Sequence, residues 1–175
     1  CCLCASTEAQ DGPALKFRDL PVRTEGDLEM FVETAGFRGS EGLSRFEIYS
    51  LLDARQLQFV PEGEKYVAQI DFTAALYDTA GEEVKRQFWT RNVSVDDLKS
   101  LKQNGALVRD VVAFDLLPGR YKLRIVVEDI YGDLSGQSEE MFEVRAFDAE
   151  GLKVSDLLFV SELEKTSDTG RFVKN

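Results

Sequence analysis

Hydrophobic and polar side chains alternate along several stretches of this chain, most cleanly after the Pro-Gly pair at 118–119. One set of alternate positions there is apolar and the other is mostly charged: Tyr121, Leu123, Ile125 and Val127 against Lys122, Arg124 and Glu128. Strand side chains project alternately to two faces, so the pattern predicts a strand between a core and water. A tyrosine that opens a strand after such a turn is typical of the corner of immunoglobulin-like sandwiches.

The same alternation, broken by turn residues, predicts the other strands. They are expected at 46–49, 57–60, 65–78, 83–95, 106–117, 121–130, 141–147 and 152–163. A short helix is expected at 96–103, where Ser94 and Asp97 can cap free amides and Asn104-Gly105 can end the helix. Short strands without helix–strand alternation favour an all-β fold, namely an immunoglobulin-like antiparallel β-sandwich of about seven or eight strands with one short helix in a crossover.

The pattern divides the chain into three parts. Residues 1–43 contain several glycines and are expected to form a flexible leader, with a docked helix or strand around 28–34. The sandwich domain is expected at 44–163, and the polar residues 164–175 are expected to link it to a following domain.

Composition excludes several classes of function. The 175 residues include 32 acidic and 21 basic side chains, a net charge of −11 that repels nucleic-acid backbones. Histidine is absent, which removes Ser-His-Asp and Cys-His nucleophiles and histidine-bound metals. A hydrolase that uses two carboxylates remains open, but neighbouring acidic residues on a strand face opposite ways. We therefore expect no enzyme, no catalytic residues and no cofactor.

The three cysteines, Cys1, Cys2 and Cys4, all precede the expected fold. No disulfide or thiolate metal site can therefore form within the core. Cys1 is a candidate lipid-bearing first residue of a bacterial lipoprotein, which would attach the protein to a membrane. Two alternatives stay open: the tail of an uncleaved signal sequence, and a chance cluster of cysteines.

Short motifs follow one another in an order found in a known family. They are Phe46-Glu-Ile-Tyr49, Leu57-Gln-Phe59, Lys65-Tyr-Val-Ala68, Leu76-Tyr-Asp78 with Gly81, Leu117-Pro-Gly-Arg-Tyr121, Val127-Glu-Asp129, Val154-Ser-Asp-Leu157 and Arg171-Phe-Val-Lys-Asn175. Over 44–175 the chain resembles the N-terminal β-sandwich region of bacterial GWxTD-domain proteins. The Gly-Trp-x-Thr-Asp motif itself is absent, since Trp89 lies in Phe-Trp-Thr-Arg. The resemblance implies export to the periplasm, the outer membrane as a lipoprotein, or the cell surface.

Two groups of residues are candidates for a site. Glu128, Asp129 and Asp133 surround a turn and could bind calcium, although turn aspartates more often bond their own backbone, so no metal is expected. Lys85, Trp89 and Arg91 could form an aromatic and basic binding face, if Phe88 fills the core and Trp89 points outward. The open alternative is that Trp89 is covered by other parts of the chain.

These observations predict a non-catalytic structural or protein-interaction module of an exported bacterial envelope protein. An exposed strand edge or the aromatic and basic face would contact a protein partner or an adjacent domain of the same protein. The alternative function is a carbohydrate-binding module that uses the face around Trp89.

Overall fold

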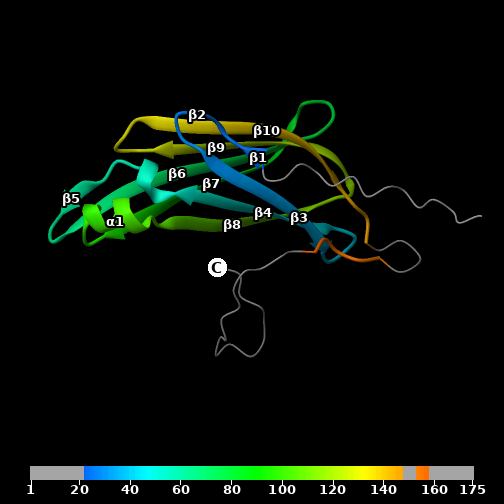
Figure 1. The fold of residues 1–175 in the computed structure, drawn as a ribbon. Helices are drawn as coiled ribbons and strands as arrows, with labels where there is room; N and C mark the ends of the chain where they lie inside the picture. The colour runs from blue at the N-terminus through cyan, green and yellow to red at the C-terminus, as the bar shows by residue number, and fades with distance from the viewer. Residues whose placement is uncertain (1–21, 148–152, 158–175) are drawn as a thin grey trace, which may run out of the picture.

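Two antiparallel β-sheets face each other in the computed structural model, which describes residues 22–147 and 153–157 (Figure 1). The four-stranded sheet has the order β1 (Val22–Arg23), β3 (Met30–Arg38), β4 (Ser44–Asp53) and β8 (Leu107–Leu116). The six-stranded sheet has the order β2 (Glu25–Gly26), β10 (Leu134–Val144), β9 (Gly119–Asp129) and β6 (Lys65–Tyr77), and β5 (Val60–Glu62) and β7 (Glu83–Val95) both pair with β6. The predicted antiparallel, immunoglobulin-like sandwich is confirmed.

The core lies between the sheets, where alternate residues of each strand meet. Phe46 of β4 stacks on Phe142 of β10 with ring centroids 4.0 Å apart, so the contact joins the two sheets. Several large side chains between the sheets are less than 2% exposed: Met30, Ile48, Leu52, Ile70, Phe72, Leu76, Ile125 and Val127. Burial of this apolar surface drives the two layers together.

The strand that follows the Pro-Gly turn forms as predicted. β9 buries Leu123, Ile125 and Val127 on its inner face, and the hydroxyl of Tyr121 donates a hydrogen bond to the carbonyl of Leu117 at 2.9 Å. A tyrosine that bonds the backbone a few residues upstream is the corner of immunoglobulin-like sandwiches.

One short helix connects β7 to β8, close to the predicted position. Helix α1 (Leu98–Asn104) follows Asp97, whose carboxylate accepts hydrogen bonds from the amides of Lys99 at 3.2 Å and Ser100 at 2.7 Å. The helix ends at Gly105, where φ is 70°. Ser94 lies within β7, so the expectation that it also caps the helix is wrong. A single 3₁₀ turn, η1 (Ala54–Gln56), follows β4.

The expected start of the sandwich at residue 44 is wrong, because residues 22–43 already belong to it. β3 pairs with β4 along its whole length, and Leu28 is fully buried. Thr24 fixes the path of this segment, since its hydroxyl donates to the carbonyl of Leu28 at 2.7 Å and accepts from the amide of Met30 at 2.8 Å. The docked helix or strand expected around 28–34 is a strand, β3, but the glycines around it break the alternation, so the pattern does not assign it to the sandwich.

The other end differs as well. The strand expected at 141–147 begins earlier, at Leu134, and ends at Val144. No strand forms at 153–157, although the amide of Asp156 donates to the carbonyl of Gly36 at 3.0 Å, beside β3. The rest of the strand expected at 152–163, the linker at 164–175 and residues 1–21 lie outside the described residues. Within the described part, no helix is long and apolar enough to cross a membrane.

Candidate functional site

Trp89, the centre of the predicted binding face, points toward the core. Its ring stacks on Phe72 with centroids 5.1 Å apart and planes 6° from parallel, and its Nε1 donates to Oδ2 of Asp110 at 2.7 Å. Phe88 lies on the opposite face of β7 and is 58% exposed. The expectation that Phe88 fills the core and Trp89 points outward is therefore wrong. Phe88 and Trp89 are both aromatic, so hydrophobic alternation alone cannot show which of them faces the core. The cross-strand pairing of Trp89 with the buried Phe72 places Trp89 on the core face.

Arg91 lies beside Trp89 and binds the same carboxylate. Its Nε donates to Oδ2 of Asp110 at 2.6 Å and its Nη2 to Oδ1 at 2.8 Å, a two-point contact with a side chain that is 3% exposed. Burial by itself would raise the pKa of Asp110. The hydrogen bonds from Arg91, Trp89 and the amide of Val111, with the charge of Arg91, outweigh burial and hold the pKa below its ordinary value.

This cluster joins the two sheets along one side of the sandwich. Asp110 belongs to β8 of the four-stranded sheet, whereas Trp89 and Arg91 belong to β7 of the six-stranded sheet. A charged group can stay buried where it is paired and hydrogen-bonded, and Asp110 meets both conditions. The carboxylate thus stabilises the fold, and sequence analysis did not identify it.

Lys85 does not share this cluster. It lies six residues before Arg91 on the same strand, which is about 20 Å away at the usual rise per residue. Its side chain is exposed, and no ion pair of Lys85 is present within the described part of the chain. The three residues of the predicted face therefore form two separate features, an inter-sheet cluster and an exposed cation.

The carbohydrate-binding alternative depended on a Trp89 that presents its ring to solvent. One face of that ring packs on Phe72, and its only hydrogen-bond donor is taken by Asp110. A sugar platform needs an open ring face, whereas the partly buried ring of Trp89 stacks on Phe72 and packs against the core. The premise of the alternative is therefore wrong.

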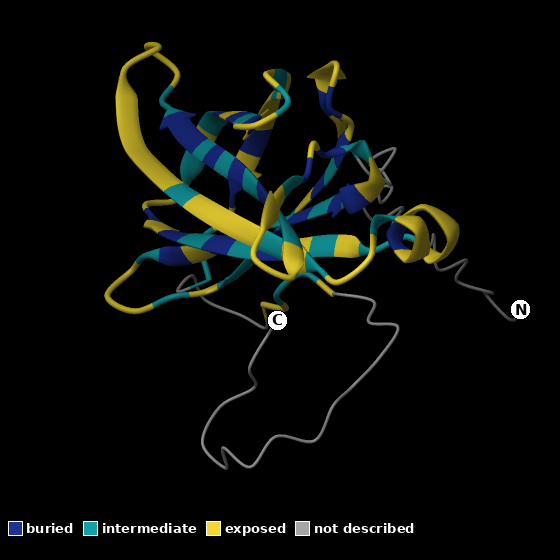
Figure 2. Ribbon diagram, turned by 90° about the vertical axis from the view of Figure 1, so that its left-hand side faces the viewer, coloured by how far each residue is buried: buried dark blue, intermediate teal, exposed yellow. Residues whose placement is uncertain are grey.

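The outer edge of β7 is open. β7 is 13 residues long and pairs only with β6, and among the described residues no strand lies on its other side. Almost every residue of β7 is exposed, in contrast with β6 beside it (Figure 2). Val84 is 40% exposed and Phe88 58%, on a strand that also carries three cations. An unpaired edge of this length can accept another strand.

The acidic turn after β9 has a structural role. Asp129 is 1% exposed, and its carboxylate accepts hydrogen bonds from the amides of Gln58 at 2.6 Å and Tyr131 at 3.2 Å. A Cβ on Gly132 would lie 2.5 Å from the same carboxylate, so a larger residue there would have to displace it. Within residues 22–147 and 153–157, no three acidic, histidine or cysteine side chains could hold a metal ion.

A third buried carboxylate lies on the outer face of the four-stranded sheet. Glu47 is 7% exposed and accepts hydrogen bonds from the hydroxyl of Tyr49 and from Nε of Arg45, the latter at 3.1 Å. Burial, the hydrogen bond to Glu47 and the negative charges of Glu47 and Glu33 raise the pKa of Tyr49 well above its ordinary value. Tyr49 therefore stays protonated and donates a hydrogen bond to the carboxylate of Glu47.

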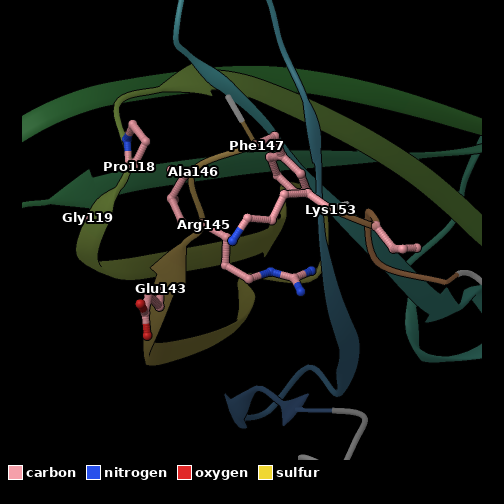
Figure 3. A pocket seen from close by; sticks show the side chains of 9 residues that line it. Pro118, Gly119, Glu143, Arg145, Ala146, Phe147 and Lys153 are labelled. Carbon is pink, nitrogen blue, oxygen red and sulfur yellow. The ribbon is translucent and has the colours of Figure 1, made fainter. Parts of the chain in front are cut away.

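A shallow hollow of about 690 Å³ lies at the end of β10, where Phe147 borders it (Figure 3). Figure 3 shows Phe147, Lys153 and Arg145 close together, with Glu143 apart from them. Arg145 lies over the ring of Phe147, 5.6 Å from its centroid, and forms an ion pair with Asp156. The charge of Arg145 is thus already balanced, so the hollow does not present a set of free cations.

Cys1, the lipidation candidate, lies outside the described residues. No family model matches the chain, and no curated protein matches its sequence. Among solved structures, the chain is similar to a β-glucuronidase of Bacteroides uniformis, with a TM-score of 0.43 and 16% identity over 66% of this chain. A structure of Bacteroides uniformis β-glucuronidase 2 bound to cyclophellitol-6-carboxylate aziridine gives a TM-score of 0.42 and 16% identity over the same share. The aligned part spans 13% of the length of each of those chains.

Proposed function

We propose that this chain is a non-catalytic structural or protein-interaction module of an exported bacterial envelope protein. Its task is to contact a protein partner or an adjacent domain of the same protein. The observation that carries the proposal is the outer edge of β7, which leaves a 13-residue strand without a neighbour among the described residues. Strand addition to such an edge supplies main-chain hydrogen bonds, and exposed side chains supply selectivity.

The carboxylates that the fold buries support the same proposal. Asp110 and Asp129 each accept several hydrogen bonds from the sandwich itself, and the pKa of Asp110 lies below its ordinary value. A general acid needs a raised pKa and access to a substrate. Asp110 has the opposite shift, and its oxygens are occupied by Arg91, Trp89 and Val111.

Location is the second part of the proposal. The resemblance to GWxTD-domain proteins and the candidate lipidation of Cys1 support an exported, envelope-associated protein. Mass spectrometry of the membrane-extracted protein should find an acylated Cys1, and Cys1→Ser should move the protein to the soluble exported fraction. An unmodified Cys1 in membrane-extracted protein would contradict lipidation.

The interaction is tested by photo-crosslinking in the cells that make the protein. A photoreactive phenylalanine analogue in place of Phe88, on β7, should give cross-linked adducts of defined mass. The same analogue in place of Glu64, an exposed residue after β5, is the control and should give far fewer. Equal adducts at both positions would contradict a contact at β7. Turnover of a glycoside or peptide by the isolated chain would contradict the non-catalytic part of the proposal.

A further inference from the structure

The two edges of the six-stranded sheet carry opposite charges. β7, at one edge, contains Lys85, Arg86 and Arg91 against a single acid, Glu83. β10, near the other edge, contains three acids and no base: Glu139, Glu140 and Glu143. The chain as a whole has a net charge of −11, so the basic edge is a local exception.

Both edges are open where these charges lie. β2 covers β10 only at Gly136 and Gln137, and the neighbouring amides of Asp27 and Leu28 bind Ser135. Residues 138–144 of β10 therefore have no strand on their outer side among the described residues, and neither has β7. Each edge thus offers unpaired backbone groups that can pair with a further strand.

The charges occupy the same rows of the sheet. One row across the sheet runs Glu140, Leu123, Leu76 and Lys85. The next row runs Glu139, Arg124, Ala75 and Arg86. Two adjacent rows therefore begin with a glutamate on β10 and end with a cation on β7. Residues of one row share a face of the sheet, so each glutamate and the cation at the other end of its row project to the same side.

The strand directions allow the sheet to continue from one molecule to the next. β10, β9, β6 and β7 are neighbours in that order, and each pair is antiparallel. Three reversals make β7 run opposite to β10. A second molecule placed beside β7, in the same orientation and without a shift along the strands, therefore presents β10 antiparallel to β7. In that register Glu140 lies opposite Lys85 and Glu139 lies opposite Arg86.

We propose that β7 of one molecule pairs with β10 of a second copy of this chain, in a head-to-tail assembly held in register by these two charge pairs. Opposite charges directly across an antiparallel pair stabilise it, and like charges destabilise it. A two-fold pairing of β7 with β7 on these rows would oppose cation to cation, and β10 with β10 would oppose glutamate to glutamate. The proposal rests on the proposed function, because it names the partner of an interaction module.

The existing contacts of the four side chains are compatible with this pairing. No ion pair of Lys85 or Glu140 is present within the described ranges. Arg86 contacts Glu83 at 2.5 Å with both side chains exposed, and Glu139 contacts Lys122 at 3.1 Å and Arg124 at 3.8 Å. Exposed pairs of this kind exchange partners at little cost. In about 0.15 M salt the Debye length is about 8 Å, so the overall repulsion between acidic molecules is damped while opposed residues still attract.

The experiment reverses the charges of each edge in the full 175-residue chain and follows association by analytical ultracentrifugation. Wild type should associate as its concentration rises. K85E/R86E and E139K/E140K should each weaken association at least tenfold, while an equimolar mixture of the two should associate again, because the opposite charges are restored between different molecules. The matched controls K99E/K102E, on α1, and E62K/E64K, at the end of β5 and just after it, change exposed charges equally and should associate as wild type does.

A monomeric wild type, or a mixture of the two reversed variants that stays monomeric, would overturn the proposal. Circular dichroism confirms that each variant is folded. As a second measurement, Arg86→Cys and Glu139→Cys chains, with Cys1, Cys2 and Cys4 replaced by serine, are mixed and oxidised. Cross-links should join 86 to 139, and links of 86 to 86 alone would overturn the head-to-tail arrangement. A monomeric wild type would contradict self-assembly but not the proposed function, which the Phe88 photo-crosslinking tests separately. The failure of one proposal can therefore be distinguished from the failure of the other.

Discussion

Asp110 links the edge strands of the two sheets, β8 and β7. It belongs to the edge strand of the four-stranded sheet, and its carboxylate binds Trp89 and Arg91 of the edge strand of the other sheet. Hydrogen bonds to a charged group contribute more than neutral ones, and a buried group that loses its partner is left unsatisfied. The single carboxylate therefore stabilises the contact between β7 and β8.

Replacement of Asp110 tests this role. Asp110→Ala should lower the free energy of unfolding by about 2–3 kcal/mol, because the indole N–H of Trp89 and the guanidinium of Arg91 lose a shared acceptor. Urea denaturation measures the change. Asp115→Ala is the matched control on the same strand, since its side chain is 54% exposed and 3.9 Å from Arg45, and it should cost less than about 0.5 kcal/mol. Equal losses for the two variants would contradict the role of Asp110.

The same carboxylate should make stability depend on pH. Its pKa is lower in the folded chain than in the unfolded chain, where aspartate has a pKa of about 3.9. Such a group stabilises the fold fully above the unfolded pKa, and the contribution is lost as the pH falls through the folded pKa. The difference in unfolding free energy between wild type and Asp110→Asn should therefore be constant from about pH 7 to 5 and shrink below about pH 4. A difference that grew toward acid would contradict the sign of the shift.

At the scale of elements, strands differ in how clearly the sequence reveals them. β9 and β6 alternate cleanly, because one face of each lies on the core and the other near water. The segment of β3 is expected only as a docked helix or strand outside the sandwich, because Thr34, Ala35 and Gly36 interrupt its run of large apolar side chains. The face of Trp89 could not be predicted either, because Phe88 is equally apolar and only the pairing with Phe72 decides. The sequence does not distinguish Asp110 from other acidic residues, because its partners Trp89 and Arg91 lie on the other sheet.

The segment before β3 is the clearest case of an element that depends on tertiary contacts. β1 pairs in the four-stranded sheet and β2 pairs in the six-stranded sheet, with only Thr24 between them. The chain thus crosses from one layer to the other within a few residues. This crossing covers β10 at Gly136, where the backbones of the two segments lie in close contact.

A methyl group at Gly136 should disrupt the crossing. A Cβ there would lie 2.1 Å from the carbonyl oxygen of Leu28 and 2.8 Å from Oγ1 of Thr24, so the backbone would have to move. Gly136→Ala should therefore cost at least about 2 kcal/mol of unfolding free energy. Gly119→Ala is the control, because its Cβ would meet nothing closer than 3.6 Å, and it should change stability by less than about 1 kcal/mol. Thermal and urea denaturation of both variants measure the difference.

At the scale of the whole molecule, the two sheets are joined to each other along both sides of the sandwich, by different kinds of contact. On one side, the segment with β1 and β2 joins the sheets through its backbone, because β1 pairs in one sheet and β2 in the other. On the other side, the hydrogen bonds of Asp110 join them through side chains. The stacked rings of Phe46 and Phe142 join the layers between them. Contacts at both sides and in the middle make each sheet depend on the other, so we expect the sandwich to unfold as one unit.

The single tryptophan reports on this coupling, because Trp89 lies on an edge strand yet contacts both sheets. Urea denaturation followed by Trp89 fluorescence and by far-ultraviolet circular dichroism should give the same midpoint and the same slope. An earlier fluorescence transition would show that β7 separates first and that the bonds to Asp110 do not couple the sheets. In Asp110→Ala the two transitions should move apart, since β7 then keeps only its pairing with β6 and the stacking of Trp89 on Phe72. Coincident transitions in that variant would assign the coupling to the apolar core alone.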